Sequence, residues 1–328
     1  MLLAGDIGGT KTLLGLFDPA PGRPRRLVVR AFGTLAYDDL SSMIEEFVGL
    51  VAAGGVPPAS ITSACFGVAG PVIDAAAELT NVPWKVDARS VTSRFGFARV
   101  TLLNDLQAMA SAVPVLEPSE VQVLQEGAAI PEGNVAVIAA GTGLGEAMLH
   151  YVNGRGLIPS PSEGGHADFA ARNEREIVLL RDLIARYGRV DVERVVCGAG
   201  LVNIHRVTHA GPCAAAIDLA DPGAPAAIST AALERRCAGC VEALDMFVDA
   251  YGAEAGNVAL RVVSTGGVYV GGGIAPKILP ALTGGAFIRA FRAKPPLEAM
   301  LDAMPVKVIL NEEAGLLGAA VAATHDQF

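Results

Sequence analysis

The sequence predicts an α/β protein with two domains. The chain has 328 residues, which is long for one hydrophobic core, and 52% of its residues are apolar. Short apolar runs that end in glycine alternate with longer stretches of helical spacing. This order is typical of mixed sheets with helices on their faces. Glycine, proline or charge interrupts every apolar run well before it could span a membrane, so we expect no membrane contact.

The first third of the chain predicts hairpin strands followed by βαβ units. LLAGDIGGTKTLLGLFD indicates two strands joined by a glycine turn, and RRLVVRAF indicates a third. SSMIEEFVGLVAAG has helical spacing between a serine cap and a glycine stop. ITSACFGVAGP is a short apolar strand, and VTLLNDLQAMASAV is a strand that runs into a helix.

The stretch NVAVIAAGTGLGEAMLHYV repeats the opening order of strand, glycine turn and strand. Gly9-Thr10 and Gly141-Thr142 can be superposed, so we interpret the two halves as a degenerate tandem duplication. Helical segments follow, then a strand that ends in a glycine triplet (GGVYVGGGI) and a final strand with a small-residue helix. No low-complexity linker separates the halves, which favours packed domains with a cleft between them.

Charge and cysteine content exclude several classes of protein. The net charge is −9 and no basic patch is present, so a nucleic-acid partner is not expected. No Lys or Arg precedes Asp6, which argues against a signal peptide. The five cysteines are an odd number, which argues against a disulfide framework and favours a reducing, cytoplasmic location.

Cys237 and Cys240 form a C-x-x-C pair inside a helical pattern. Because no second pair accompanies them, the sequence disfavours zinc. We interpret them as two small residues on a helix face.

The glycine turns are candidate phosphate loops. Gly8-Gly9-Thr10 lies between two strands, and neither the Walker pattern nor a G-x-G-x-x-G that opens a helix occurs. Consecutive glycines let backbone N–H groups point into one concavity that suits phosphate oxygens. One such hairpin alone would be a tight turn. Two hairpins and a glycine triplet fit one nucleotide, and Asp6 could hold Mg²⁺ directly or through water.

Two further stretches carry candidate polar groups. Asn104 and Asp105 follow an apolar strand, where they are either a helix cap or a catalytic carboxylate at the strand's carboxyl end. In SPSEGGHADF, a glycine pair separates Glu163 from His166, and each glycine disfavours a helix by about 1 kcal/mol. A loop that presents carboxylate and imidazole to one small ligand therefore fits better than a metal site, with a surface turn as the alternative.

Nine motifs in the same order resemble those of the bacterial ATP-dependent glucokinase family, within the sugar kinase, Hsp70 and actin superfamily. The resemblance runs from about Gly5 to about Ala320. The motifs are GDIGGTK, GVAGPV, LTNVPW, NDLQAMA, GTGLG, EGGHADF, ERVVCGAGLVN, GGVYVGGGI and EEAGLLGAA.

The resemblance implies a two-domain, actin-like ATPase fold of the ribonuclease H-like type. Each domain would hold a mixed five-stranded sheet flanked by helices, with the ligand cleft between the domains and the last helix back in the first domain. We expect a small α/β domain at 1–112 plus 308–328 and a large one at 113–307. ATP and Mg²⁺ would bind between them, and members are commonly homodimers.

The same resemblance implies site residues and an activity. The activity is glucokinase, the ATP-dependent phosphorylation of D-glucose at its C6 hydroxyl to glucose 6-phosphate in glycolysis, with Asp105 as general base. The first phosphate loop would contain Asp6, Gly8, Gly9 and Thr10, the second Gly141, Thr142 and Gly143, and the adenosine loop Gly271, Gly272 and Gly273. Glucose would be bound by Asn104, Asp105, Glu163, His166 and Glu193, with Asn81 in a motif near the sugar.

Two residues depart from the family pattern. Glu146 stands where we expect a small or apolar residue, and it would put a carboxylate near the phosphates unless the strand turns it outward. Lys11 replaces the family's frequent Asn after the first loop. Both affect the expected phosphate contacts rather than the sugar contacts.

Three alternatives to glucokinase remain open. A repressor–ORF–kinase type enzyme for another hexose or an N-acetyl amino sugar would usually carry a zinc-binding Cys cluster soon after the His motif, but no Cys lies between Cys65 and Cys197. A non-catalytic sugar sensor would need a helix-turn-helix segment, for which we expect no room before Asp6. An actin-like or chaperone ATPase would have no use for the EGGH loop.

Overall fold

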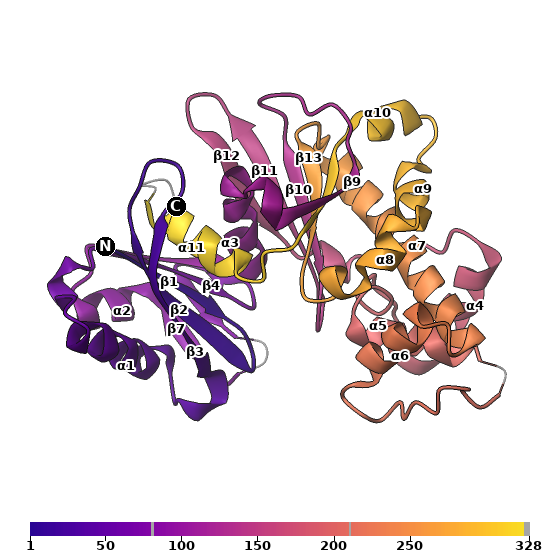
Figure 1. Cartoon of the computed structure of the whole chain (residues 1–328), viewed down its shortest axis with the longest axis horizontal. Coiled ribbons are helices and arrows are strands. Elements are labelled where there is room, and N and C mark those ends of the chain that lie inside the picture. Colours follow the sequence, from indigo (N-terminus) through magenta and orange to yellow (C-terminus); the bar gives the residue numbers. More distant parts are fainter. Residues whose placement is uncertain (80–81, 210, 325–328) are drawn as a thin grey trace. The chain divides into compact units, whose positions relative to one another are not determined.

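The computed structural model describes residues 1–79, 82–209 and 211–324. The chain divides into two compact units, which we call unit 1 (Met1–Glu117, Ile158–Pro161 and Asn311–Phe328) and unit 2 (Pro118–Leu157 and Ser162–Leu310). Figure 1 follows the chain through them, from indigo at the N-terminus to yellow at the C-terminus.

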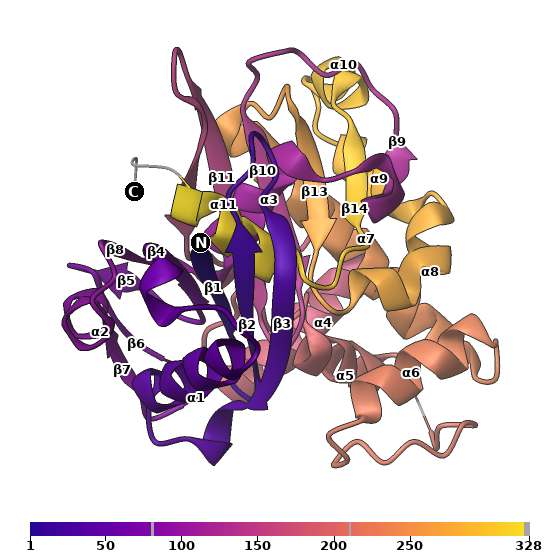
Figure 2. The same cartoon turned by 60° about the vertical axis from the view of Figure 1, so that its left-hand side comes forward.

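Unit 1 is built on a mixed five-stranded sheet in the order β3-β2-β1-β4-β8 (Figure 2). The first three strands form an antiparallel meander, and β1, β4 and β8 run parallel. This matches the predicted hairpin followed by βαβ units. The strands are β1 (Leu2–Ile7), β2 (Lys11–Asp18), β3 (Arg25–Gly33), β4 (Ser63–Val68) and β8 (Arg99–Asn104). A small side sheet contains β5 (Val72–Ile73), β6 (Ala76–Glu78) and β7 (Lys85–Asp87).

Helices cover both faces of this sheet. One hydrophobic cluster joins it to α1 and α2, and a second joins it to α3 and α11. The cap of α1 is Asp39, whose carboxylate accepts the N–H of Ser42, rather than the expected serine. Gly318 lets α11 approach α3, because a Cβ there would come 1.7 Å from the Ala108 carbonyl oxygen. The helices are α1 (Leu40–Ala53), α2 (Ala88–Phe95), α3 (Asp105–Ala112) and α11 (Ala314–Thr324).

The second sheet has six strands in the order β12-β11-β10-β13-β14-β9, one more than the five expected. The additional strand is β9, which pairs antiparallel with β14 at the sheet edge. Because β14 also pairs with β13, residues 308–310 fall in unit 2 instead of the small domain proposed from the sequence. Residues 113–117 and 158–161 fall in unit 1 instead of the proposed large domain. The strands are β9 (Val121–Gln125), β10 (Val135–Ala140), β11 (Leu144–Val152), β12 (Gly156–Ser162), β13 (Gly267–Gly271) and β14 (Val306–Ile309).

The long helix α7 forms the centre of unit 2, where Tyr251 and Phe247 are fully buried. Gly252 lets α9 pack closely, because a Cβ there would lie 2.2 Å from the Phe287 carbonyl oxygen. No helix in the described part of the chain is long and apolar enough to cross a membrane. The helices are α4 (Glu174–Tyr187), α5 (Gly198–Val207), α6 (Ala224–Leu233), α7 (Ala238–Val262), α8 (Leu279–Thr283), α9 (Ala286–Arg292) and α10 (Glu298–Ala303).

Candidate functional site

The first glycine turn of unit 1 is fixed by hydrogen bonds. The N–H of Gly8 donates to the Lys11 carbonyl at 3.1 Å, and the Thr34 hydroxyl donates to the Gly8 carbonyl at 2.8 Å. Asp6 lies half-buried beside the turn, against the first turn of α11, since a Cβ on Gly315 would come 2.7 Å from its Oδ2. Burial raises the pKa of Asp6 to about 6, and the positive charge of Lys11 opposes this rise. A carboxylate held in this way suits a divalent cation, which offsets the cost of keeping it ionised.

Asn104 and Asp105 lie where β8 runs into α3. Asn104 caps the helix, with its Oδ1 accepting the N–H of Leu106 at 2.9 Å and its own N–H donating to Gln107 Oε1 at 3.1 Å. Its Nδ2 donates to the Gly70 carbonyl at 3.3 Å. The cap interpretation is therefore correct for Asn104, and the capping box fixes the half-buried Asp105 as the first residue of α3.

The parallel strands of unit 1 bring these groups to one sheet edge. Ile7 pairs with Val68 on β4, and Val68 pairs with Asn104 on β8. With strands spaced about 4.8 Å apart, the end of β8 lies about 10 Å from the end of β1. Asp6, the first glycine turn and Asp105 therefore share the carboxyl edge, where open α/β sheets bind ligands. Asn81, the remaining predicted residue of this unit, lies outside the described residues.

The other two glycine clusters follow neighbouring parallel strands of unit 2. Gly141–Gly143 comes after β10, and 271–273 comes at the end of β13, which pairs with β10. Gly272 has a φ of +83°, and a Cβ there would lie 2.4 Å from the Ala140 carbonyl oxygen. Only glycine can occupy this position without strain. The close contact between Gly272 and Ala140 shows that the two turns pack against each other at one edge of the sheet.

The EGGH segment forms a loop, as its glycine pair predicts. The Glu163 carbonyl accepts the N–H of His166 at 3.0 Å, which closes one 3₁₀ turn over Gly164–His166. The side chains of Glu163 and His166 are exposed, and His166 Nδ1 lies 3.5 Å from Asp191 Oδ2. A carboxylate beside an imidazole offers both acceptors and a donor to a ligand.

Glu193 connects this loop to the second glycine turn. Its N–H donates to the Gly165 carbonyl at 2.9 Å, and its Oε2 accepts the N–H of Leu144 at 2.8 Å. A Cβ on Gly143 would come 2.5 Å from the same oxygen. The structure thus brings Glu193 together with the EGGH loop and the Gly141–Gly143 turn, a link that sequence pattern alone does not reveal.

Glu146 does not face the second glycine turn. It is fully buried, and its Oε2 accepts from Arg261 Nη1 of α7 at 3.2 Å. Burial and the neighbouring carboxylate of Glu254 raise the pKa of Glu146 to about 8, while Arg261 opposes the rise. The departure from the family pattern is therefore accommodated inside unit 2, where Glu146 is buried against α7.

A cavity of about 650 Å³ opens beside the second glycine turn. Its floor is apolar, from residues such as Phe247 and Ile278, while the exposed cations Arg206 and Lys277 lie at its rim. This size and mixture suit a nucleoside. The lining is formed by Gly141, Thr142, Tyr187, Gly198, Ala199, Leu201, Val202, Asn203, Arg206, Leu219, Ala220, Asp221, Pro222, Pro225, Ala226, Ser229, Leu244, Phe247, Ile274, Lys277 and Ile278.

The structure adds residues that sequence reasoning missed. The N–H of Gly198, at the start of α5, donates to the Gly141 carbonyl at 2.9 Å, so this helix start adjoins the second glycine turn. The Tyr251 hydroxyl accepts the Ala140 N–H at 3.1 Å and donates to the Gly271 carbonyl at 3.3 Å. It therefore joins the ends of β10 and β13. In the sequence, the CGAG motif is the only feature that points to Gly198. Nothing points to Tyr251, because a buried tyrosine in a helix has no distinguishing pattern.

Comparison with known proteins agrees with this geometry. The glucokinase family model matches residues 3–326. A glucokinase from Nostoc punctiforme is 39% identical over 99% of both chains. The structure of a glucokinase from an Antarctic psychrotroph superposes with a TM-score of 0.84 at 27% identity over 98% of both chains. A glucokinase of the ROK family from Streptomyces griseus, solved with glucose and AMPPNP, shares the fold with a TM-score of 0.66 at 21% identity, over 98% of this chain and 99% of that one. The chain therefore belongs to the glucokinase family, which phosphorylates glucose with ATP.

Proposed function

We propose that Asp105 is the general base that activates the C6 hydroxyl of glucose. The observation that supports this role is the capping box, which holds Asp105 rigidly at the carboxyl edge of the first sheet. A sugar hydroxyl is a weak nucleophile at neutral pH, and a positioned carboxylate raises the rate typically by about 10²–10⁴-fold.

In the proposed step, the Asp105 carboxylate accepts the C6 hydroxyl proton while the oxygen bonds to the γ-phosphorus of ATP. The bond from that phosphorus to the β–γ bridging oxygen breaks, and ADP leaves with its electron pair. Positioning and charge stabilisation dominate such transfers, so the protein needs little covalent chemistry. The products are glucose 6-phosphate and ADP.

Sugar recognition is proposed for Asn104, Glu163, His166 and Glu193, and for Asn81 on the family pattern alone. In unit 2 this role is supported by the contacts that bring Glu163, His166 and Glu193 to one loop system. A site made of such polar groups rejects analogues that lack a hydroxyl, because a buried donor or acceptor is then left without a partner.

Nucleotide binding is proposed for the three glycine clusters, Gly8–Thr10, Gly141–Gly143 and 271–273. Their backbone N–H groups would bind the phosphates, and the cavity beside Gly141 would take the adenosine. Asp6 fits Mg²⁺ because its half-buried carboxylate is held in a site that raises its pKa. When bound, the ion would neutralise charge on the phosphates.

The cellular setting is also a proposal. We infer that the enzyme works in the cytoplasm as a homodimer and supplies glucose 6-phosphate to glycolysis. The support is membership of the family, together with a cysteine content that suits a reducing compartment. Analytical ultracentrifugation tests the dimer directly.

The activity is tested with a coupled ADP-release assay with Mg–ATP against glucose, mannose, fructose, N-acetylglucosamine and N-acetylmannosamine. We expect glucose to have the highest kcat/KM. Preference for an N-acetyl amino sugar would favour the alternative kinase, and tight glucose binding with no turnover on any sugar would favour a sensor.

The base assignment is tested with Asp105→Asn. We expect kcat to fall about 10²–10⁴-fold, while the Kd for glucose from calorimetry changes little. The matched control is Asp74→Asn, an exposed carboxylate elsewhere in unit 1. Near-normal kcat in Asp105→Asn would remove Asp105 from the base role.

A further inference from the structure

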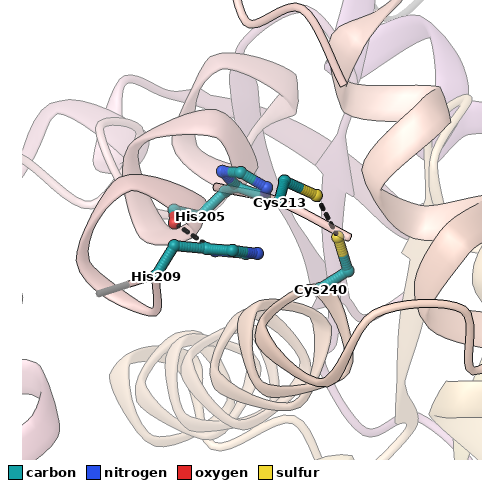
Figure 3. Close-up of side chains that lie close together, drawn as sticks. All are labelled: His205, His209, Cys213 and Cys240. Atoms are coloured by element: carbon teal, nitrogen blue, oxygen red, sulfur yellow. Dashed lines mark hydrogen bonds between the residues drawn. The ribbon is translucent and has the colours of Figure 1, made fainter. Parts of the chain in front are cut away.

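A cluster of sulfur and imidazole groups lies in unit 2, away from every residue assigned above to glucose. It contains His205 from the last turn of α5, His209 and Cys213 from the segment after that helix, and Cys237 and Cys240 from the N-cap and first turn of α7. We refer to these five residues as the His–Cys cluster. Figure 3 shows four of them, with both imidazole rings directed toward the sulfurs of Cys213 and Cys240.

The separations within the cluster match those between ligands of a tetrahedral zinc ion. Cys213 Sγ lies 3.7 Å from Cys237 Sγ and 3.6 Å from Cys240 Sγ, and His209 Nε2 lies 3.3 Å from Cys237 Sγ. Zinc–sulfur bonds of about 2.3 Å at the tetrahedral angle put two sulfurs about 3.8 Å apart. A disulfide needs about 2.05 Å, and all five cysteines of the chain are free thiols.

The orientation of His209 is set by its surroundings. Its Nδ1 lies 2.8 Å from the His205 carbonyl oxygen, so Nδ1 carries the proton and Nε2 keeps its lone pair toward Cys237. Metal-binding histidines are commonly oriented by such a second hydrogen bond. Gly239 leaves room for the ring, because a Cβ there would lie 2.5 Å from His209 Nε2.

His205 packs against His209 but is not part of the ligand set proposed below. It is 4% exposed, and neither of its ring nitrogens has a hydrogen-bond partner among the described residues. Its ring stacks on His209 with centroids 3.8 Å apart and planes 26° apart. A metal lies in the plane of the imidazole that binds it, so two nearly parallel rings cannot both bind one ion.

We propose that Cys213, Cys237, Cys240 and His209 bind one structural Zn²⁺ ion. Three sulfurs and one imidazole nitrogen complete a closed tetrahedral set, which is the pattern of structural zinc sites. On this proposal, the C-x-x-C pair is more than the two small helix residues that the sequence predicts. The sequence does not indicate the other ligands, because Cys213 and His209 are separated from the pair by more than twenty residues and only the fold brings them together.

The ion would link the segment after α5 to the start of α7. It would thereby hold together the two ends of the segment between Cys213 and Cys237. Part of this segment, from Leu219 to Pro222, lines the cavity proposed for adenosine. This consequence rests on the proposed function. Loss of zinc should raise the KM for ATP at least threefold and leave the KM for glucose unchanged. Equal KM values for ATP with and without zinc would disprove the link to the cavity, although not the zinc site itself.

The zinc site is tested by metal analysis of the full chain, purified without chelators from zinc-supplemented medium. We expect one zinc per chain by mass spectrometry of the metal, and less than a tenth of this in Cys213→Ala and Cys240→Ala. The matched control is Cys65→Ala, a buried cysteine of unit 1, which should keep its zinc. A wild-type protein without zinc after incubation with ZnCl₂, or equal loss in the Cys65 variant, overturns the proposal.

Two measurements keep the test valid if the cysteine variants fail to fold. In the wild type, a mercurial thiol reagent should release zinc in step with thiol modification, as followed with a metal-sensitive dye. Cobalt substitution should give the intense visible bands of a tetrahedral thiolate complex, whereas a weak octahedral spectrum contradicts the site.

The choice of histidine is tested with two further variants. His209→Ala should weaken zinc binding at least 100-fold, whereas His205→Ala should retain it. The reverse result would disprove the ligand set.

Discussion

The carboxylate of Glu146 lies directly beneath the backbone of Gly164. A Cβ at Gly164 would come 1.9 Å from Glu146 Oε2. A buried carboxylate on β11 therefore supports the loop that carries Glu163 and His166. The hydrogen bond from Arg261 Nη1 to Glu146 Oε2 holds this support in place.

Gly164→Ala should destabilise the protein by about 1–3 kcal/mol, since the added methyl group overlaps Glu146. Combining it with Glu146→Ala should remove most of this cost, because the space is then free, giving a favourable coupling energy of about 1–2 kcal/mol. Thermal unfolding of the wild type, both single variants and the double variant measures the coupling. Gly49→Ala, on the exposed face of α1, is the control and should stabilise by about 0.5–1 kcal/mol. Strictly additive effects in the cycle would contradict the contact.

Glu146→Gln should change how stability depends on pH. The raised pKa means that between about 4.5 and about 8 the folded protein keeps a proton that the unfolded chain has lost. The stability that this proton contributes is complete below 4.5 and is lost as the pH rises through 8. The variant should match the wild type near pH 5 and be the more stable of the two near pH 9. Melting curves across this range measure the difference, with the exposed Glu126→Gln as control; a constant offset at every pH would show that the proton is not involved.

Asp6 should make Mg–ATP binding depend on pH. Its pKa of about 6 means that the Asp6 carboxylate is largely protonated in the free enzyme below pH 6. Binding of Mg²⁺ then has to displace this proton. We expect the Kd for Mg–ATP to rise as the pH falls from 7 to 5 in the wild type. In Asp6→Asn, binding should be at least tenfold weaker at pH 7 and less dependent on pH. Calorimetry with Asp18→Asn as control tests this, and identical pH profiles for wild type and Asp6→Asn would exclude Asp6.

Asn104 should show two separable roles. Asn104→Ala removes the cap of α3 and should cost about 1 kcal/mol, while Asn104→Ser keeps a capping oxygen and should recover most of it. If the amide also binds glucose, both variants should have a raised KM for glucose, because serine cannot reach as far. Melting temperature and KM are measured on the same preparations. Recovery of the KM by serine would leave Asn104 with the capping role only.

The sequence alone determined the features that depend on neighbouring residues. Alternation and glycine turns defined the hairpin of β1 and β2, and the glycine pair between Glu163 and His166 predicted a loop. The junction of β8 and α3 was recognised from VTLLND, because strand periodicity and helix capping are local properties. Ordered motifs then indicated the family, which the comparisons confirm.

The tertiary structure decided the features that depend on distant residues. β9 joins the second sheet through β14, which lies about 180 residues later in the chain. Nothing in the β9 sequence, VQVLQ, indicates that β14 is its partner. The burial of Glu146 against Arg261, and the meeting of His209 with Cys237, likewise follow from helix packing. Local periodicity records which face of a segment is apolar, but it does not record which other segment will cover that face, so these contacts appear only when the chain is folded.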